Sequence, residues 1–259
     1  MERNIIDRKV NDATKKFTAL HGDMVVDMVN DLYGIHGVRP SSRTIMYRLK
    51  GLGLIGKGDV KKVEALVALL KLTGRIDVHK MIDAKRSMYG TSTYKDAKEA
   101  TDELAGRFKM DLWKDQDNKV LIMCEASGYT DVISAVASKY RCDYMGSGGD
   151  ISVHWKVMIA SAGYTHIVYV GDMDTKGMEI PVTMIDDINF MQNYRGMKNT
   201  ELVRIEHDVL KYDVELENVD IDYIRDLISD EVNNLIDMVS WKKSLAVESD
   251  EAMKISSND

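Results

Sequence analysis

Three acidic side chains follow apolar runs in the second half of the chain. Glu125 directly follows residues 119–124, and Asp172 and Asp174 follow residues 166–170. Both runs are typical of buried parallel strands, and α/β sheets place their sites at the carboxyl ends of such strands. The D-x-D spacing matters because alternate residues of an extended segment point the same way and can share a cation. Carboxylate oxygens suit a hard cation, so the sequence predicts a Mg²⁺ site, although acidic residues at such turns also cap helices.

Other chemical motifs in the chain are weak. Gly51, Gly53 and Gly56 match GxGxxG, but they follow a predicted helix, whereas a dinucleotide site needs this pattern after a strand. No GxxxxGK[ST] pattern occurs, and the six histidines form no HExxH pair and no clear triad. Cys124 and Cys142 lack CxxC spacing, which argues against a zinc ribbon or a disulfide framework and indicates a reduced, intracellular protein.

Charge is distributed unevenly along the 259 residues. The formal net charge of -7 argues against a nucleic-acid binder when the chain is taken whole. Residues 1–110, however, hold 21 basic and 14 acidic side chains, while residues 111–259 hold 14 basic and 28 acidic ones. This asymmetry suggests a part that faces nucleic acid beside a part with another role. The charged N-terminus and the shortness of every apolar stretch predict no membrane association, and we expect a cytoplasmic, DNA-associated protein.

The basic part of the chain has helical periodicity. Apolar residues recur at helical spacing in three segments, and a fourth segment alternates as a short strand does. These segments are residues 20–34, 41–51, 59–74 and, for the strand, 75–82. Three helices and a strand on a basic background predict a winged helix-turn-helix over residues 20–105, after an N-terminal extension at 1–19 and before a linker at 106–118.

The acidic part alternates strands with helices. We expect strands at 119–124, 142–145 and 166–170, and helices at 130–140 and 152–163. This alternation predicts an α/β domain with a parallel sheet over residues 119–247. A further strand at 211–216 and a helix at 223–240 are expected to extend it, followed by a polar, frayed tail at 248–259.

Several segments, in order, resemble one known family. VLIMCEASG, GSGGDIS and HIVYVGDMDTKGMEI resemble the Rossmann-like Toprim domain, the metal-binding module of topoisomerases, primases and certain nucleases. The details are similar to the A subunit of type IIB DNA topoisomerase (topoisomerase VI) and to the related meiotic double-strand-break transesterase. Arg43-Thr-Ile-Met46-Tyr47 matches the family's R-x-x-[YF]-Y at both ends, and KYDVELENV resembles its C-terminal vELdAL segment. Met46, and Thr175 with Lys176 after the D-x-D, depart from the family pattern.

The resemblance implies a function and a set of roles. Tyr47 would attack the backbone of double-stranded DNA and form a 5′-phosphotyrosyl link, with Arg43 stabilising the developing charge and Glu125, Asp172 and Asp174 holding Mg²⁺. Glu179 would be a weaker ligand. The family architecture also implies a homodimer in which each tyrosine meets the partner's metal site, and a separate ATPase B-type subunit. The short chain suggests a minimal form, as a virus or mobile element could encode.

Two alternatives remain open at this point. The carboxylates alone would also serve a Toprim nuclease that hydrolyses DNA with metal-activated water. The basic N-terminal part alone would also serve a non-catalytic winged-helix DNA-binding protein beside a vestigial Toprim fold.

Overall fold

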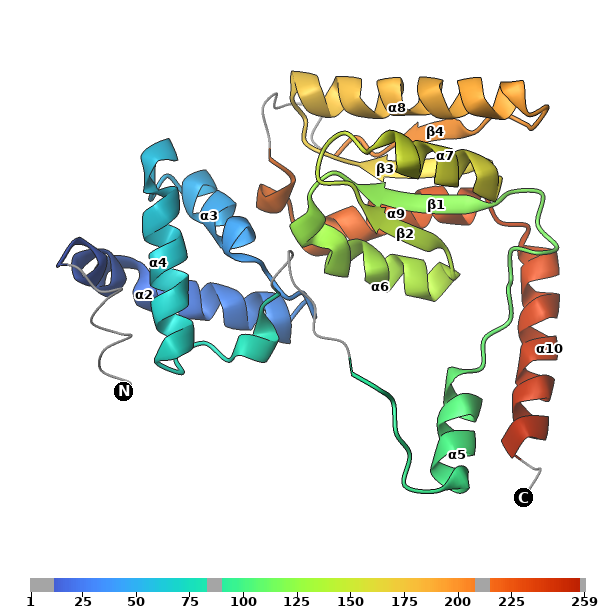
Figure 1. The fold of residues 1–259 in the computed structure, drawn as a ribbon, viewed down its shortest axis with the longest axis horizontal. Coiled ribbons are helices and arrows are strands. Elements are labelled where there is room, and N and C mark those ends of the chain that lie inside the picture. The colour runs from blue at the N-terminus through green and yellow to red at the C-terminus, as the bar shows by residue number, and fades with distance from the viewer. Residues whose placement is uncertain (1–11, 83–89, 208–214, 257–259) are drawn as a thin grey trace.

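The computed structural model of the chain describes residues 12–82, 90–207 and 215–256. Figure 1 shows a helical part built from the N-terminal residues beside an α/β part, with two further helices below the latter. The helical part consists of α2 (Asp12–Gly34), α3 (Ser42–Gly51) and α4 (Val60–Leu72). All three helices were expected from the sequence, although α2 begins earlier than residue 20. The glycine pattern at residues 51–56 falls in the turn between α3 and α4.

The α/β part contains a four-stranded sheet in the order β2-β1-β3-β4, and every neighbouring pair is parallel. This confirms the predicted α/β class with a parallel sheet. Its strands are β1 (Val120–Cys124), β2 (Asp143–Gly146), β3 (His166–Val170) and β4 (Glu201–Arg204). All five residues of β1 are buried, as a central parallel strand requires.

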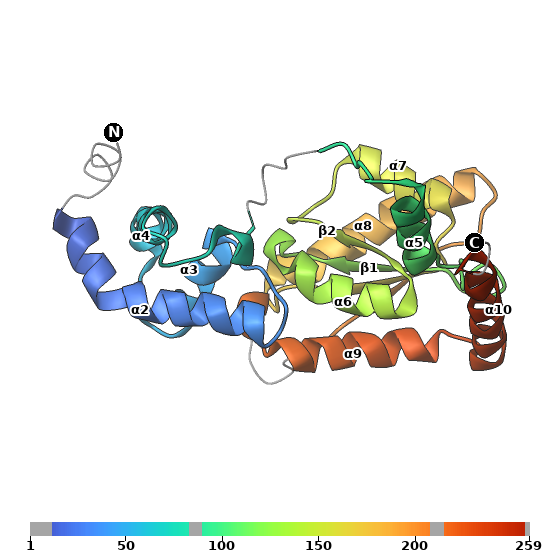
Figure 2. The same cartoon turned by 90° about the horizontal axis from the view of Figure 1, so that it is seen from below.

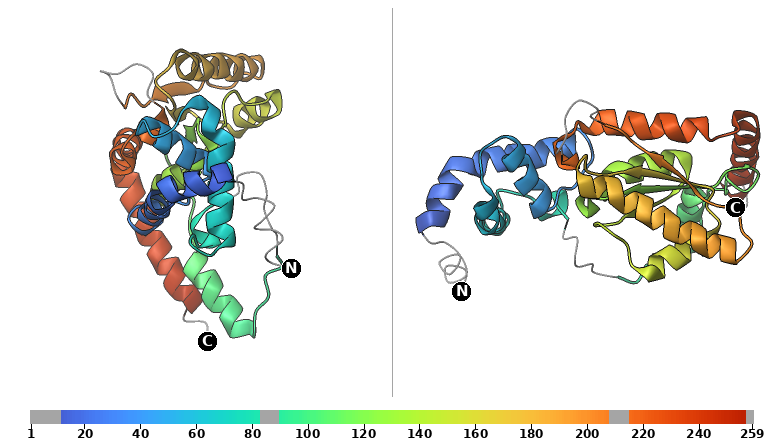
Figure 3. Two further views of the ribbon diagram at one scale, coloured as in Figure 1. Left: turned by 90° about the vertical axis from the view of Figure 1, so that its left-hand side faces the viewer. Right: turned by 90° about the horizontal axis from the view of Figure 1, so that it is seen from above.

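Helices cover both faces of the sheet, as Figures 2 and 3 show. One face packs against α6 (Thr130–Tyr140) and α9 (Ile221–Asn234), and the other against α7 (Val153–Ala162) and α8 (Thr175–Tyr194). The remaining helices, α5 (Ala97–Arg107) and α10 (Met238–Ser256), lie side by side. Short 3-10 turns connect the elements: η1 (Lys57–Asp59), η2 (Val78–Lys80), η3 (Ser127–Tyr129) and η4 (Leu216–Asn218).

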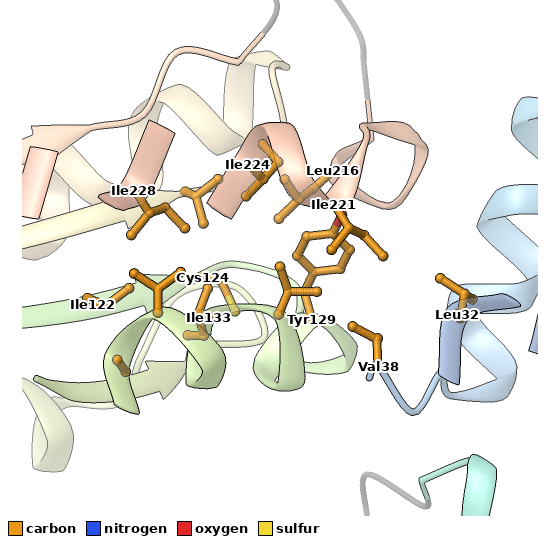
Figure 4. Close-up of a cluster of buried hydrophobic side chains, with 14 of the residues drawn as sticks. Leu32, Val38, Ile122, Cys124, Tyr129, Ile133, Leu216, Ile221, Ile224 and Ile228 are labelled. Atoms are coloured by element: carbon orange, nitrogen blue, oxygen red, sulfur yellow. The ribbon is translucent and has the colours of Figure 1, made fainter. Parts of the chain in front are cut away.

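One hydrophobic cluster runs from the helical part into the α/β part. It joins Val25 and Leu66 of the N-terminal helices to Ile122 of β1 and Ile224 of α9, all at 0% exposure. Figure 4 shows the part of this cluster between α6 and α9, where the Tyr129 ring points towards Leu216 and Ile221. Burial of this continuous apolar surface holds the two parts of the chain together.

The strand expected at residues 75–82 is wrong. Residues 78–80 form the 3-10 turn η2, because the Asp77 side chain accepts a hydrogen bond from the His79 amide at 3.0 Å and bends the backbone. The flanking amides are also taken, since Ile76 N donates to Leu70 O and Ile82 N donates to Pro40 O. Alternating hydrophobicity is present here, but the backbone groups are bonded to helices and turns instead of to a neighbouring strand.

The C-terminal region also differs from expectation. The helix expected at 223–240 is two helices, because α9 ends at Asn234 and Asp237 starts α10 by accepting the Val239 amide on its Oδ1 at 2.9 Å. The tail expected to fray from Glu248 is helical to Ser256, since the Glu248 carboxylate is paired with Arg141. Of the strand expected at 211–216, residues 211–214 lie outside the described residues, and Leu216 belongs to η4.

Within the described ranges, no helix combines the length and apolar character that crossing a membrane requires.

Candidate functional site

The carboxyl ends of β1 and β3 bring Glu125 and Asp172 together. Cys124 of β1 is in register with Val170 of β3, so the residues that follow both strands meet at one edge of the sheet. Glu125 N donates to Val170 O at 2.9 Å, and the Asp172 amide donates to Glu125 Oε2 at 3.1 Å. A Cβ at Gly171 would lie 2.7 Å from Glu125 Oε2, so glycine at this position permits the close approach of the Glu125 carboxylate.

Asp172 is held from two sides. Its Oδ1 accepts a hydrogen bond from the Leu216 amide of η4 at 2.8 Å. Its carbonyl accepts one from Arg204 Nη2, at the end of β4, at 3.2 Å. The side chain and main chain of Asp172 are therefore fixed by two segments that follow it in the sequence.

Asp174 is both the second acidic residue of the D-x-D segment and the capping residue of α8. It is the N-cap of α8, where its Oδ1 accepts the Gly177 amide at 2.7 Å, so the simple helix-capping role that the sequence allowed does apply here. Gly177 in turn packs against the Asp172 carbonyl, and a Cβ there would also lie 3.1 Å from Glu125 Oε2. The cap thus closes the turn between β3 and α8 around the other two carboxylates.

The electrostatics of this cluster favour a cation. Burial raises the pKa of Glu125, and the charges of Asp172 and Asp174 raise it further, while the Asp172 amide and Arg204 act against this rise. Burial likewise raises the pKa of Asp172, with the Leu216 amide opposing and Asp174 and Glu215 adding to the rise. The carboxylates disfavour one another's charge, and a positive ion among them would relieve that repulsion.

The three carboxylates offer the donor atoms that Mg²⁺ prefers, but their arrangement does not form a complete set of metal ligands. Oxygen donors on Glu125, Asp172 and Asp174 are the ligands that this ion prefers. In the part of the chain that the structure describes, however, no group of three or more His, Cys, Asp or Glu side chains is arranged to hold a metal. A Mg²⁺ ion that keeps most of its waters and takes one or two carboxylates suits this arrangement. Glu179 is exposed on α8, and its charge is not among those that shift the pKa of Glu125 or Asp172.

Arg43 and Tyr47 lie on one face of α3. The helix starts at a reciprocal cap in which Ser41 Oγ accepts the Thr44 amide at 3.1 Å and Thr44 Oγ1 accepts the Ser41 amide at 3.3 Å. One turn later, Arg43 Nε and Nη2 both donate to the Tyr47 hydroxyl, at 3.1 and 2.8 Å. The i,i+4 relation expected from the sequence therefore produces a direct contact.

Two contacts seat α3 on the α/β part. At the start of α3, Gly128 of η3 packs against Thr44 Oγ1 and Ser41 Oγ. A Cβ at Gly128 would lie only 2.7 Å from Thr44 Oγ1. At its end, Lys50 forms an ion pair with Glu215, the residue before η4. Figure 1 shows η4, in orange, between α3 and the sheet.

The hydrogen bond to Tyr47 is the largest cause of a raised Arg43 pKa, to which the charges of Glu217 and Asp172 also contribute. The structure thus brings the Arg43–Tyr47 pair towards the carboxylates of the same chain.

Sequence reasoning did not assign roles to Arg204, Glu215 or Glu217. Glu217 is 5% exposed, and burial, with the charges of Asp172 and Glu215, raises its pKa to about 7 while Arg43 opposes. Glu215 and Glu217 lie in the segment that resembles the family's vELdAL, which marked the region without a role for its side chains. Arg204 ends β4, a strand that the sequence analysis did not predict, so no signal placed it at the site.

Comparison of the chain with protein-family models, curated proteins and solved structures found no significant match.

Proposed function

We propose that the protein is a DNA-cleaving transesterase resembling the A subunit of type IIB topoisomerases, with Tyr47 as the nucleophile. The observation that carries this proposal is the pair of hydrogen bonds from Arg43 to the Tyr47 hydroxyl, on a helix whose Arg43 lies close enough to Asp172 for that carboxylate to raise the Arg43 pKa. In this proposal, residues 20–105 act as a DNA-binding domain of the winged-helix kind, although the described residues of this range form helices and turns and no strand. Residues 119–247 act as a Toprim domain.

The reaction exchanges one phosphodiester for another. Tyr47 Oη attacks the phosphorus, the Oη–P bond forms, and the bond from phosphorus to the 3′ oxygen breaks. The proton of the phenol ends on the released 3′ hydroxyl, so no oxidant or further reactant is needed. A neutral phenol is a weak nucleophile, so the attack requires stabilisation of the negative charge that develops on Oη, and two N–H donors of Arg43 are placed to supply it.

The carboxylates would contribute through a bound cation. Glu125 and Asp172, with Asp174 as the adjoining cap, would hold Mg²⁺, which supplies positive charge to the phosphate and to the departing oxygen. Their oxygen donors and mutual repulsion support this role. Double-stranded DNA, a homodimer, a separate ATPase B-type subunit and a cytoplasmic, DNA-associated location belong to the same proposal.

Covalent adduct formation tests the proposal. Protein, Mg²⁺ and supercoiled plasmid are incubated and quenched with detergent, and we expect protein-linked linear DNA from the wild type and none from Tyr47→Phe. Tyr194→Phe, which alters an 87% exposed tyrosine at the end of α8, is the matched control and should behave as the wild type does. An adduct that persists in Tyr47→Phe would overturn the assignment.

The carboxylate cluster also favours a second candidate, a metal-dependent nuclease. In that case the products would carry free 5′ phosphates without attached protein, and cleavage would survive Tyr47→Phe while being lost in Glu125→Gln. Salt-sensitive DNA binding without cleavage of any kind would instead support a non-catalytic binding protein.

A further inference from the structure

Residues 215–218, here called the strap, contact the carboxylate cluster on one side. The Leu216 amide donates to Asp172 Oδ1 at 2.8 Å. Leu216 itself is 0% exposed, and Figure 4 shows its side chain above the Tyr129 ring. Tyr129 OH also donates to Val219 O at 3.3 Å, directly after the strap. This side of the strap is therefore anchored in the core and bonded to a proposed metal ligand.

The strap contacts the end of α3 on its other side. Glu215 forms an ion pair with Lys50, and the Asn218 side chain lies so close to Gly51 that no Cβ could stand there without displacing it. Lys50 follows Tyr47 by three residues on the helix, and its Nζ lies 5.8 Å from the centre of the Tyr47 ring. The residue that pairs with the strap thus also borders the proposed nucleophile.

Glu217 lies between these two sets of contacts. It is 5% exposed, and its carboxylate is close enough to both Arg43 and Asp172 for each charge to act on it. The strap therefore contacts α3, which carries Tyr47, through Glu215 and Asn218. It contacts the carboxylate cluster through Leu216.

We propose that the strap couples the position of α3 to the Asp172 carboxylate of the same chain, with Lys50 and Glu215 as positioning residues. A cation that fixes Asp172 would then also restrict α3, and loss of the Lys50–Glu215 pair would break that link. The catalytic consequence rests on the proposed transesterase function, whereas the mechanical coupling rests only on Mg²⁺ binding at Asp172, which the transesterase and the nuclease would share.

Amide hydrogen exchange of α3, with and without Mg²⁺, tests the coupling directly. We expect Mg²⁺ to slow exchange of α3 amides in the wild type and in Lys50→Arg, which keeps the charge, and to lose this effect in Lys50→Met. Glu215→Gln is a second variant that breaks the same pair. Lys61→Met, an exposed position on α4, removes one positive charge from the same part of the chain and should keep the Mg²⁺ effect. A Mg²⁺ effect that is absent in the wild type, that survives in Lys50→Met and Glu215→Gln, or that Lys61→Met also loses, would overturn the proposal.

The catalytic consequence is measured at saturating plasmid and Mg²⁺. Lys50→Met should lower the rate of adduct formation by about ten- to a hundredfold, because a small displacement of the nucleophile is costly, and Lys50→Arg should restore most of it. DNA affinity should fall alike in Lys50→Met and Lys61→Met, since each loses one positive charge. Equal adduct rates in these two variants would contradict a positioning role. A wild type that forms no adduct would defeat the proposed function, while the exchange result would still decide the coupling.

Discussion

At the scale of single residues, the Tyr47 hydroxyl receives two hydrogen bonds from one guanidinium group, at 3.1 and 2.8 Å. Such charge-assisted bonds strengthen as negative charge develops on the oxygen, so they stabilise a phenolate more than a phenol. The planar fork of arginine supplies both donors at once, which a lysine ammonium cannot match in geometry. Under the proposed function, Arg43 would therefore activate Tyr47 in addition to any general attraction for DNA.

Replacement of Arg43 should slow cleavage much more than it weakens binding. We expect Arg43→Gln to lower the rate of adduct formation at saturating DNA by about a hundred- to a thousandfold, the usual cost of a lost stabilising donor. Arg43→Lys should recover only part of this rate. Because Arg43 is exposed, the free energy of unfolding should change by less than about 1 kcal/mol, measured by urea denaturation.

A matched charge change separates activation from electrostatic attraction. Lys61→Gln, on α4, removes the same unit of charge and should lower DNA affinity to a similar degree with an unchanged rate at saturation. If Arg43→Gln retained the wild-type rate at saturating DNA, the activation role of Arg43 would be wrong.

At the scale of elements, the turn between β3 and α8 depends on two glycines. Gly171 and Gly177 both pack against Glu125 Oε2, and Gly177 also packs against the Asp172 carbonyl. A side chain at either position would push the carboxylates apart. The D-x-D segment can therefore lie this close to Glu125 only because Gly171 and Gly177, on either side of it, carry no Cβ.

Gly177→Ala should disturb this turn. Its Cβ would collide with the backbone oxygen of Asp172, which cannot rotate away, so we expect a loss of about 1–3 kcal/mol in unfolding free energy and weaker Mg²⁺ binding. Gly106→Ala in α5, where nothing lies within 4 Å of an added Cβ, should be neutral or stabilise by up to about 1 kcal/mol. Calorimetric Mg²⁺ titration and urea denaturation measure both effects. Unchanged stability in Gly177→Ala would mean that the turn is not as closely packed as the structure has it.

A partly buried ion pair between Arg141 and Glu248 holds the last helix, α10. Glu248 of α10 accepts hydrogen bonds from Arg141 and from the Met110 amide, and Arg141 is the largest cause of a Glu248 pKa lowered from 4.5 to about 2. A carboxyl group whose pKa is lower in the folded state than in the unfolded state stabilises the fold at pH values above its unfolded-state pKa. This contribution is lost as the pH falls through the folded-state pKa.

Glu248→Gln should therefore destabilise the protein in a pH-dependent way. We expect a loss of about 2 kcal/mol at pH 7, shrinking as the pH falls below 4.5 towards 2, where the wild-type carboxylate also becomes protonated. Urea denaturation at a series of pH values measures this. Glu251→Gln, one turn away in an exposed pair with Lys254, should cost no more than about 0.5 kcal/mol at any pH. A pH-independent difference for Glu248→Gln would contradict the ion-pair explanation.

The elements that sequence patterns predicted well are those with strong periodicity. The apolar run at 166–170 and the amphipathic run at 130–140 coincide with β3 and α6, because burial of a regular element imposes its period on the sequence. β4 was missed since ELVR is short and mixed in character, and it is a strand only because β3 offers it a parallel partner. At residues 75–82 the error was the opposite one, a predicted strand that does not form. A local hydrogen bond from His79 N to Asp77 outweighed the alternating pattern. The roles of Arg204 and Glu215 depend on contacts with residues far away in the sequence, which no local pattern encodes.

At the scale of the whole molecule, ion pairs between the basic and acidic parts of the chain add to the hydrophobic cluster that joins them. Arg39 forms a two-pronged pair with Asp131 at the start of α6, and Lys50 pairs with Glu215. Arg225 of α9 reaches in the other direction and donates to the carbonyl of His36. Opposite charges from the two parts therefore help to hold α3 against η3 and η4 of the α/β part. We propose that this arrangement serves covalent cleavage of DNA by Tyr47.

The identity of the residue attached to cleaved DNA tests this proposed function most directly. Adduct formed with Mg²⁺ and plasmid is digested with nuclease and protease, and the peptides are analysed by mass spectrometry. We expect a nucleotide joined through its 5′ phosphate to Tyr47, and no such peptide from Arg43→Gln at short reaction times. A nucleotide attached to any other residue, or wild-type cleavage products without attached peptide, would contradict it.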